Sequence, residues 1–270
     1  MKQERLLIRQ TGERVFQFAG ELRNFVFFTG ELLYSLGQAI RHPGKIRWAD
    51  TLRCMNICGA DGLPITFLIC YLAGIIIGYQ AAVQMQKYGA DSFLPGLVGC
   101  TMARELAPLL VAVIATGRCG SAFAAEIGTM KVYEEIDAMR TMGLNPCRFL
   151  VIPKILAMIA MIPLLTVFGD LAGVLGGLTV GRTQLGMPLE VYMQTTFIWI
   201  KYKYFLEGIF KSVIFGIIIT VVGCFRGFQT GSDAAAVGKA TTQAVVSSIL
   251  TIIITDAILA HLFNTIFFAG

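Results

Sequence analysis

The apolar positions of this chain gather into five long stretches separated by polar segments. The clearest lies between Asp61 and Lys87, where 25 consecutive residues carry no charge and Ile and Leu are dense. A helix that crosses the hydrocarbon core of a bilayer needs about 20 mainly apolar residues. The pattern therefore predicts an all-α integral membrane protein with five transmembrane helices. Their expected ranges are 63–85, 93–117, 155–181, 205–225 and 240–268.

The first 47 residues follow a different pattern, in which apolar and charged positions interleave at roughly helical spacing. The apolar positions include Leu6, Leu7, Val15, Phe16, Phe18, Leu22, Phe25, Val26, Leu32, Leu33 and Leu36. Such a pattern is typical of amphipathic helices lying in the membrane interface. A soluble helical cap packed on other loops is the alternative. His42-Pro43-Gly44 breaks the helix before a single transmembrane domain over 48–270.

Composition supports a membrane protein and excludes nucleic acid as a partner. Apolar residues make up 56% of the 270 positions, charged residues 14%, and the mean hydropathy is +0.70. A soluble domain carries about 25% charged residues. The net charge of +5 is modest and forms no long basic run. We therefore interpret the positive charge as a signal of membrane topology.

The distribution of Lys and Arg predicts the orientation. With a cytoplasmic N-terminus, the inner side holds nine in residues 1–53, five in 118–154 and two in 223–243, whereas the outer side holds five. Because cytoplasmic loops carry an excess of Lys and Arg, we expect the N-terminus inside and the C-terminus outside. The first residues lack an apolar core followed by a cleavage site, so no cleavable signal peptide is expected.

Neither a metal nor a cofactor is expected in this chain. The seven cysteines form no CxxC pair, and there are two histidines. The segment GSDAAAVGKATT from Gly231 resembles a phosphate-binding loop, but Gly231 and Gly238 are seven apart and Ala240 follows Lys239. A phosphate-binding loop needs an offset of five and a following Ser or Thr. If ATP drives this protein, we expect a partner chain to bind it with Mg²⁺.

Glycines recur at a spacing of four within two predicted spans. Gly169, Gly173, Gly177 and Gly181 do so in the third, and Gly74 and Gly78 in the first. Small residues at this spacing let helix backbones approach closely in lipid. We expect both sets to serve helix packing.

Arg104 and Glu105 form a charged pair about 11 residues into the second predicted span, near mid-bilayer. A charge there is costly unless it is paired or hydrated. Adjacent helical residues point about 100° apart, so we expect each to find its partner on another helix, such as Asp256, Asp170 or Lys211. The pair is either a pin between helices or a polar element of a substrate cavity.

The segment after the second span carries a short charged helix, expected at about 130–142. Glu134 and Asp137 share one face. Lys131 can reach Glu135, and Asp137 can reach Arg140, and such pairs stabilise an exposed helix. A protruding helix between two spans is suited to contact a cytoplasmic partner.

These segments carry a specific resemblance. RELAPLLVAVIATGRCGSAFAAEIGTM, then EEIDA, then AVGKATTQAVV before the last span are similar to the MlaE/YrbE family of ABC permeases, the membrane subunits of MCE-type lipid transporters. The similarity covers about residues 60–270. It implies a homodimer of five-helix protomers with N-terminal interfacial helices in the bacterial inner membrane. The implied cargo is phospholipid or a similar lipid.

The resemblance also implies partners and sites. A separate ATPase would dock on the helix between the second and third spans, with Glu134, Glu135 and Asp137 at the coupling positions, and a small STAS-type subunit could accompany it. An MCE-domain protein would sit on the outer face. We expect the lipid cavity to combine Arg104 and Glu105 with apolar walls. Those walls would be Leu72, Ile76, Tyr79, Leu97 and Ile253.

Two other classes of function are weighed against lipid transport. An ion-coupled secondary transporter would use Arg104, Glu105 and Asp256 as a relay, but we see no inverted repeats of the kind common in such transporters. An intramembrane enzyme would need a nucleophile or metal set, and no Ser-His-Asp or paired-carboxylate arrangement stands out. Lipid translocation by an ATPase-driven permease is the leading hypothesis.

Overall fold

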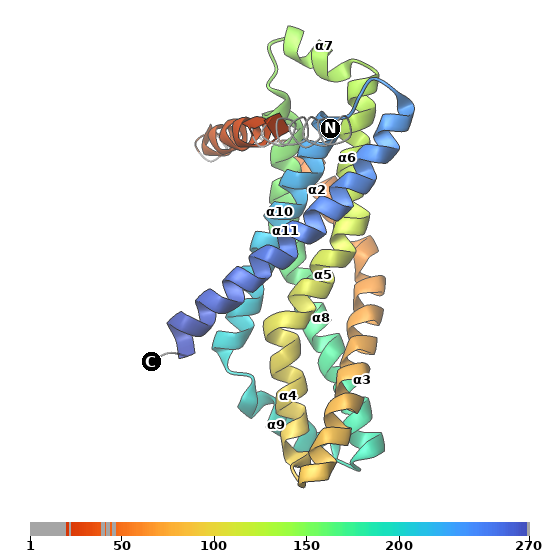
Figure 1. Cartoon of the computed structure of the whole chain (residues 1–270), viewed down its shortest axis with the longest axis vertical. Coiled ribbons are helices and arrows are strands. Elements are labelled where there is room, and N and C mark those ends of the chain that lie inside the picture. Colours follow the sequence, from red (N-terminus) through yellow and green to blue (C-terminus); the bar gives the residue numbers. More distant parts are fainter. Residues whose placement is uncertain (1–19, 22, 39–40, 42–43, 45–46, 269–270) are drawn as a thin grey trace, which may run out of the picture.

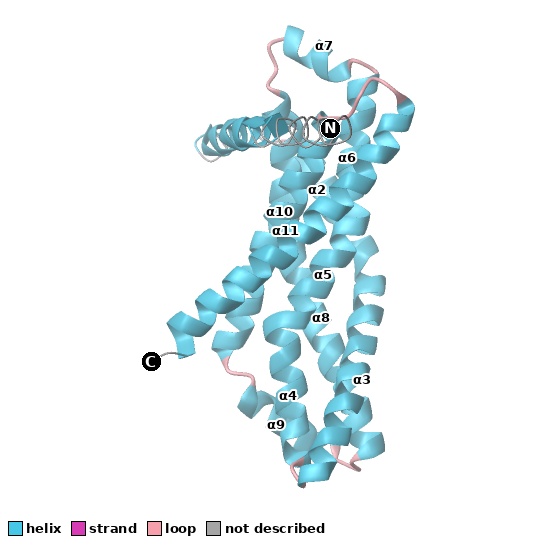
Figure 2. Ribbon diagram, viewed as in Figure 1, coloured by secondary structure: helices cyan, strands magenta, loops and turns pink. Residues whose placement is uncertain are grey.

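The computed structural model describes residues 20–21, 23–38, 41, 44 and 47–268, and these form helices and loops without any strand (Figure 2). After the N-terminal segment, the α-helices are α2 Trp48–Cys58, α3 Leu63–Tyr88, α4 Leu94–Thr101, α5 Ala107–Ala115, α6 Ser121–Val132, α7 Glu135–Thr141, α8 Ile152–Gln184, α9 Leu189–Trp199, α10 Tyr202–Phe228 and α11 Ala234–Phe268. Three π-helical segments interrupt them, at Met102–Leu106, Thr116–Gly120 and Cys147–Val151.

Within these residues, five helical segments are long and apolar enough to cross a membrane. They run over Trp48–Tyr88, Asp91–Val132, Cys147–Gln184, Tyr202–Phe228 and Ala234–Thr265. Figure 1 shows them side by side as one elongated bundle, with α7 at one end and α9 at the other. The prediction of an all-α protein with five spans is confirmed.

The second span is longer than predicted. We expected it to end at 117 and a loop to follow, but the helix continues through Thr116–Gly120 and α6 to Val132. The expected loop was wrong because Gly117, Arg118 and Gly120 look like a helix end in sequence. In the structure Gly120 lies against Gly223 of α10, where a side chain would not fit. At 1.5 Å per residue the 42 residues measure about 63 Å, twice the hydrocarbon core.

The glycines of α8 serve helix packing, as predicted. A methyl group added at Gly74 of α3 would overlap the carbonyl of Gly173, and one at Gly173 would overlap Met102. Because lipid provides no hydrophobic push between helices, such close backbone contact is a main source of their attraction. Tyr71 and Ile75 approach Gly176 in the same way. The backbones of α3 and α8 are therefore in direct contact along this stripe of glycines.

Helix α9, Leu189–Trp199, was not predicted. It begins after Pro188 and is too short to cross a bilayer. Its Tyr192 is fully buried against Gly177 and Gly181, and its Trp199 lies against Gly96 of α4. Gly177 and Gly181 of α8 therefore also provide the space into which Tyr192 of α9 packs.

The described part of the N-terminal segment is helical at residues 20–21 and 23–38 and lies across the bundle (Figure 1). One face packs on α10, where the ring centroids of Phe25 and Phe225 are 5.1 Å apart. The other face is apolar and exposed, since Phe27 and Leu33 are 71% and 64% exposed. The packing on α10 agrees with the packed cap, and the position of the helix in the membrane interface stays a prediction. The predicted positions from Leu6 to Phe18, and Leu22, lie outside the described residues.

Candidate functional site

Two charged regions stand out, and the first is a cluster inside the bundle. It is built where α10 passes the π-helical segment Met102–Leu106. A side chain at Gly208 of α10 would overlap the carbonyl of Ala103, so the two backbones are in contact there. This approach brings Glu207 and Lys211 of α10 beside Arg104 and Glu105. We call Arg104, Glu105, Glu207, Lys211, Asp256 and Asn264 the ionic cluster.

The ionic cluster connects three helical segments through charged contacts. The Nε atom of Arg104 donates to Glu207 at 3.1 Å, and its Nη2 donates to Asn264 Oδ1 at 2.6 Å. The ammonium of Lys211 donates to Glu105 and lies 3.0 Å from Asp256 Oδ1. Arg104 therefore links the second span to α10 and α11. Lys211, which belongs to α10, links that helix to the second span and to α11.

Burial makes these contacts energetically important. The side chains of Lys211 and Glu207 are 0% and 5% exposed, whereas Glu105 is 32% exposed. Three carboxylates face two cations, so the cluster carries a formal charge of −1 when all are ionised. Removing one partner from a buried ion pair leaves an uncompensated charge, which costs about 3–5 kcal/mol. Both cations are already engaged by carboxylates, which favours the pin over a free phosphate-binding role.

The predicted partners of the charged pair are partly correct. Lys211 and Asp256 belong to the cluster, but Asp170 does not: it is buried on α8, and its Oδ1 atom has no hydrogen-bond partner among the described residues. Arg104 and Glu105 were expected not to meet, yet Arg104 Nε lies 3.5 Å from Glu105 Oε1. They meet because both side chains turn toward α10. Glu207 and Asn264 were missed as partners.

The predicted cavity walls are not gathered around the cluster in the single chain. Leu72, Ile76 and Tyr79 lie on one exposed face of α3, opposite the glycines that pack on α8. Leu97 of α4 and Ile253 of α11 are 39% and 51% exposed. The role of these side chains in a substrate cavity stays a prediction.

The second charged region is α7, which protrudes beyond the bundle (Figure 1). Glu134 precedes it with a φ of 60°, in the left-handed region that a residue other than glycine rarely adopts. The chain turns at this residue, so α7 leaves the direction of α6. Arg140 Nη1 donates to Asp137 Oδ1 at 3.3 Å, and both side chains are exposed, as the sequence predicted.

The charged helix is shorter than predicted. We expected it at about 130–142, with Lys131 paired to Glu135, but residues to Val132 belong to α6 and α7 begins at Glu135. The turn at Glu134 removes Lys131 from the face of Glu135. Lys131 Nζ instead donates to the carbonyl oxygen of Phe228 at 2.7 Å. The base of α7 is thereby joined to the end of α10.

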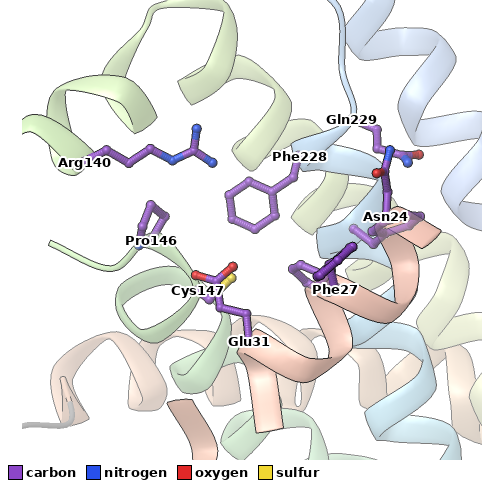
Figure 3. A pocket seen from close by; sticks show the side chains of 10 residues that line it. Asn24, Phe27, Glu31, Arg140, Pro146, Cys147, Phe228 and Gln229 are labelled. Atoms are coloured by element: carbon purple, nitrogen blue, oxygen red, sulfur yellow. The ribbon is translucent and has the colours of Figure 1, made fainter. Parts of the chain in front are cut away.

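A cavity of about 260 Å³ lies beside this base (Figure 3). Arg140 of α7 borders it on one side, Glu31 and Phe27 of the N-terminal helix on another, and Phe228 at the end of α10 on a third. The carboxylate of Glu31 lies near Cys147, where the third span begins. Three separate elements therefore meet where a partner on α7 would approach.

The segment that resembles a phosphate-binding loop is part of a helix. Gly238 and Lys239 lie inside α11, so their backbone N–H groups point along the helix instead of cradling a phosphate. In the described part of the chain, no group of three or more His, Cys, Asp or Glu side chains could hold a metal ion. Its seven cysteines are free thiols.

Comparison with known proteins identifies the family. The family model described as Permease MlaE matches residues 51–262. The chain belongs to the MlaE permease family. It is therefore the permease subunit of an ABC transporter and is expected to work with an ATPase partner. The matched range includes the ionic cluster except Asn264, and all of α7.

Relatives agree with this placement over most of the chain. A protein of Rickettsia felis named "Probable ABC transporter permease protein" is 32% identical over 95% of this chain and 97% of its own length. A Synechocystis protein of the same description is 35% identical over 87% and 88%. The Arabidopsis protein TRIGALACTOSYLDIACYLGLYCEROL 1, chloroplastic, is 31% identical over 82% of this chain and 63% of its own length. The secondary-transporter and enzyme hypotheses find no support in these relatives.

Proposed function

We propose that this permease moves phospholipid or a similar hydrophobic lipid between the bacterial inner membrane and a periplasmic MCE-domain carrier. A separate ATPase would supply the energy. The observation that carries the proposal is membership of the MlaE family. The name of the Arabidopsis relative, which contains that of a glycerolipid, supports a lipid cargo.

The arrangement of charge supports the same proposal. A lipid has a polar head and apolar tails, so its path needs apolar surface with few polar groups. Exposed aliphatic side chains on α3 and α11 offer such surface, and the partly exposed Glu105 brings polarity to mid-depth. A homodimer would bring two such surfaces together about a two-fold axis. In this proposal the N-terminus is cytoplasmic and the C-terminus periplasmic.

ATPase docking is assigned to α7. Its first turn carries Glu135 and Asp137, Glu134 stands before it, and the helix protrudes from the bundle. The joint between Lys131 and Phe228 would pass movement of α7 into α10. Nucleotide binding is assigned to the partner, so the purified chain alone should hydrolyse no ATP above background. Lys239→Ala should leave nucleotide binding by the complex unchanged.

Purification of the complex with its ATPase tests the function. Lipids that remain bound should be identified by mass spectrometry, and the complex should be reconstituted into vesicles containing a fluorescent phospholipid. We expect enrichment of phospholipid and ATP-dependent transfer to an added MCE-domain protein. Ion-coupled movement without ATP, or a bound cargo that is not a lipid, would refute the proposal.

A further inference from the structure

A second cavity, of about 450 Å³, lies between α2, α6 and the start of the third span. Its wall combines charged and apolar side chains. They are Arg47, Asp50, Arg53, Cys54, Ile57, Glu126, Met130, Phe149, Leu150, Pro153 and Lys154. It shares no residue with the ionic cluster or with α7, so neither role described above accounts for it.

The cavity has one cation in excess and unused hydrogen-bond donors. Arg47 pairs with Asp50 at 2.9 Å, and Lys154 Nζ pairs with Glu126 at 2.9 Å. Arg53 is exposed and forms no ion pair with a described residue. The side chain of Lys154 is 6% exposed, and its ammonium has three N–H donors, of which the described residues take up one. A buried ammonium with unused donors, in a cavity that is also lined by the Arg53 guanidinium, favours an anionic ligand.

The position of the cavity indicates where that anion comes from. Helix α3 alone has 26 residues and measures about 39 Å, more than the hydrocarbon core, so α2 lies at the level of the lipid headgroups. The half-exposed Trp48 at the start of α2 fits this depth, since tryptophan is enriched at membrane interfaces. Ile57 and Met130 add an apolar wall next to the cations.

We propose that this cavity binds the headgroup of an anionic phospholipid from the leaflet on the α7 side. The phosphate would lie against Lys154 and Arg53, and the acyl chains along Ile57 and Met130. This site shares no residue with the proposed translocation path and does not depend on which cargo is carried.

Cys54 provides a direct test, because it lines the cavity and is partly exposed. The full chain in detergent micelles should be titrated with phosphatidylglycerol, and alkylation of Cys54 by a water-soluble maleimide should be followed by peptide mass spectrometry. We expect phosphatidylglycerol to slow this alkylation and phosphatidylcholine to do so much less. Alkylation of the partly exposed Cys100 on α4 should not change.

Matched variants locate the effect. Arg53→Gln removes the cation that has no ion-pair partner among the described residues and should raise the lipid concentration at half-protection about fivefold, the expected contribution of one cation near an anionic lipid. Arg53→Lys should retain protection. Lys239→Gln, an equal charge change on exposed α11 surface, should have no effect.

Three results would overturn the proposal. One is an unchanged titration in a folded Arg53→Gln variant, and another is an equal shift in Lys239→Gln. The third is full protection by inorganic phosphate alone, which would show a free-anion site instead of a lipid site. Lipid transport by the assembled complex is measured separately, so either proposal can fail without the other.

Discussion

The ionic cluster and α7 contain the same kinds of charged residues in opposite surroundings. In the cluster, Lys211 and Glu207 are almost inaccessible and each contacts more than one partner. On α7, Asp137 and Arg140 form a single pair, and both side chains are more than 60% exposed. A surface pair contributes little because water screens it, whereas a buried charge without a partner is costly. Burial therefore favours a role of the cluster in the stability of the bundle, whereas the charged side chains of α7 are accessible to solvent.

Lys211→Met should have the largest effect on stability. It removes the cation that contacts Glu105 and Asp256, and the expected loss is about 3–5 kcal/mol. Apparent melting temperature and yield in detergent would measure it. Lys201→Met, at an exposed site just before α10, is the control and should change little. A Lys211→Met protein as stable as the control would show that the cluster is not a pin.

Arg104→Ala should destabilise less. Glu207 would lose its 3.1 Å contact but would keep Lys211 at 3.9 Å, so we expect about 1–3 kcal/mol. Melting temperature and co-purified lipid should be measured on the same sample. A fall in stability with normal lipid content indicates the pin, and a fall in lipid content and transport at nearly unchanged stability indicates a cavity role. Normal stability, lipid content and transport together would contradict both.

Reversing Glu134 and Glu135 to Lys should leave the melting temperature of the permease nearly unchanged, because both side chains are exposed, whereas α7 packs through the buried Ile136 and Met139. Binding of the ATPase in a pull-down at physiological salt should be lost. Glu190→Lys, an exposed reversal at the α9 end, should keep binding. Survival of the complex in the Glu134 and Glu135 variant would show that docking lies elsewhere.

Asp137→Ala should have the smallest effect on folding, no more than about 0.5 kcal/mol, since it breaks one exposed pair on a short helix. Its melting curve should overlay that of the unmodified chain. A loss comparable to that of Arg104→Ala would mean that α7 is held by contacts beyond those described.

Most of the fold could be predicted because the features that define it, long apolar stretches and regularly spaced glycines, can be recognised along the sequence itself. Apolar stretches long enough to cross a bilayer are visible without any knowledge of contacts, and the spacing of Gly169, Gly173, Gly177 and Gly181 indicated close helix packing. The wrong predictions concern elements whose position or length depends on contacts between residues far apart in the sequence. The position of helix α9 depends on Tyr192, which fills the space beside Gly177. The second span continues past Gly120 into α6 because α10 packs against Gly120.

The site could be predicted only in part for the same reason. Arg104 and Glu105 were conspicuous because charges in an apolar stretch are rare. Glu207 and Lys211 are a charged pair four residues apart in a predicted span, yet only Lys211 was expected to contact Arg104 or Glu105. The turn at Glu134 had no signal, since nothing in the sequence marks a left-handed glutamate.

Helix α10 touches both charged regions, and this has a mechanical consequence. Glu207 and Lys211 lie in its first half, and Phe228, whose carbonyl oxygen accepts from Lys131, is its last residue. The 27 residues between Tyr202 and Phe228 form one uninterrupted rod of about 40 Å. A tilt of about 10° around its midpoint would displace Phe228 by about 3.5 Å and Glu207, which is closer to the midpoint, by about 2 Å, enough to stretch the 3.1 Å contact between Glu207 and Arg104 beyond hydrogen-bonding distance. A rotation imposed at the base of α7 would thus open or re-form the contacts of Arg104 in the middle of the membrane, without any change in the helix itself.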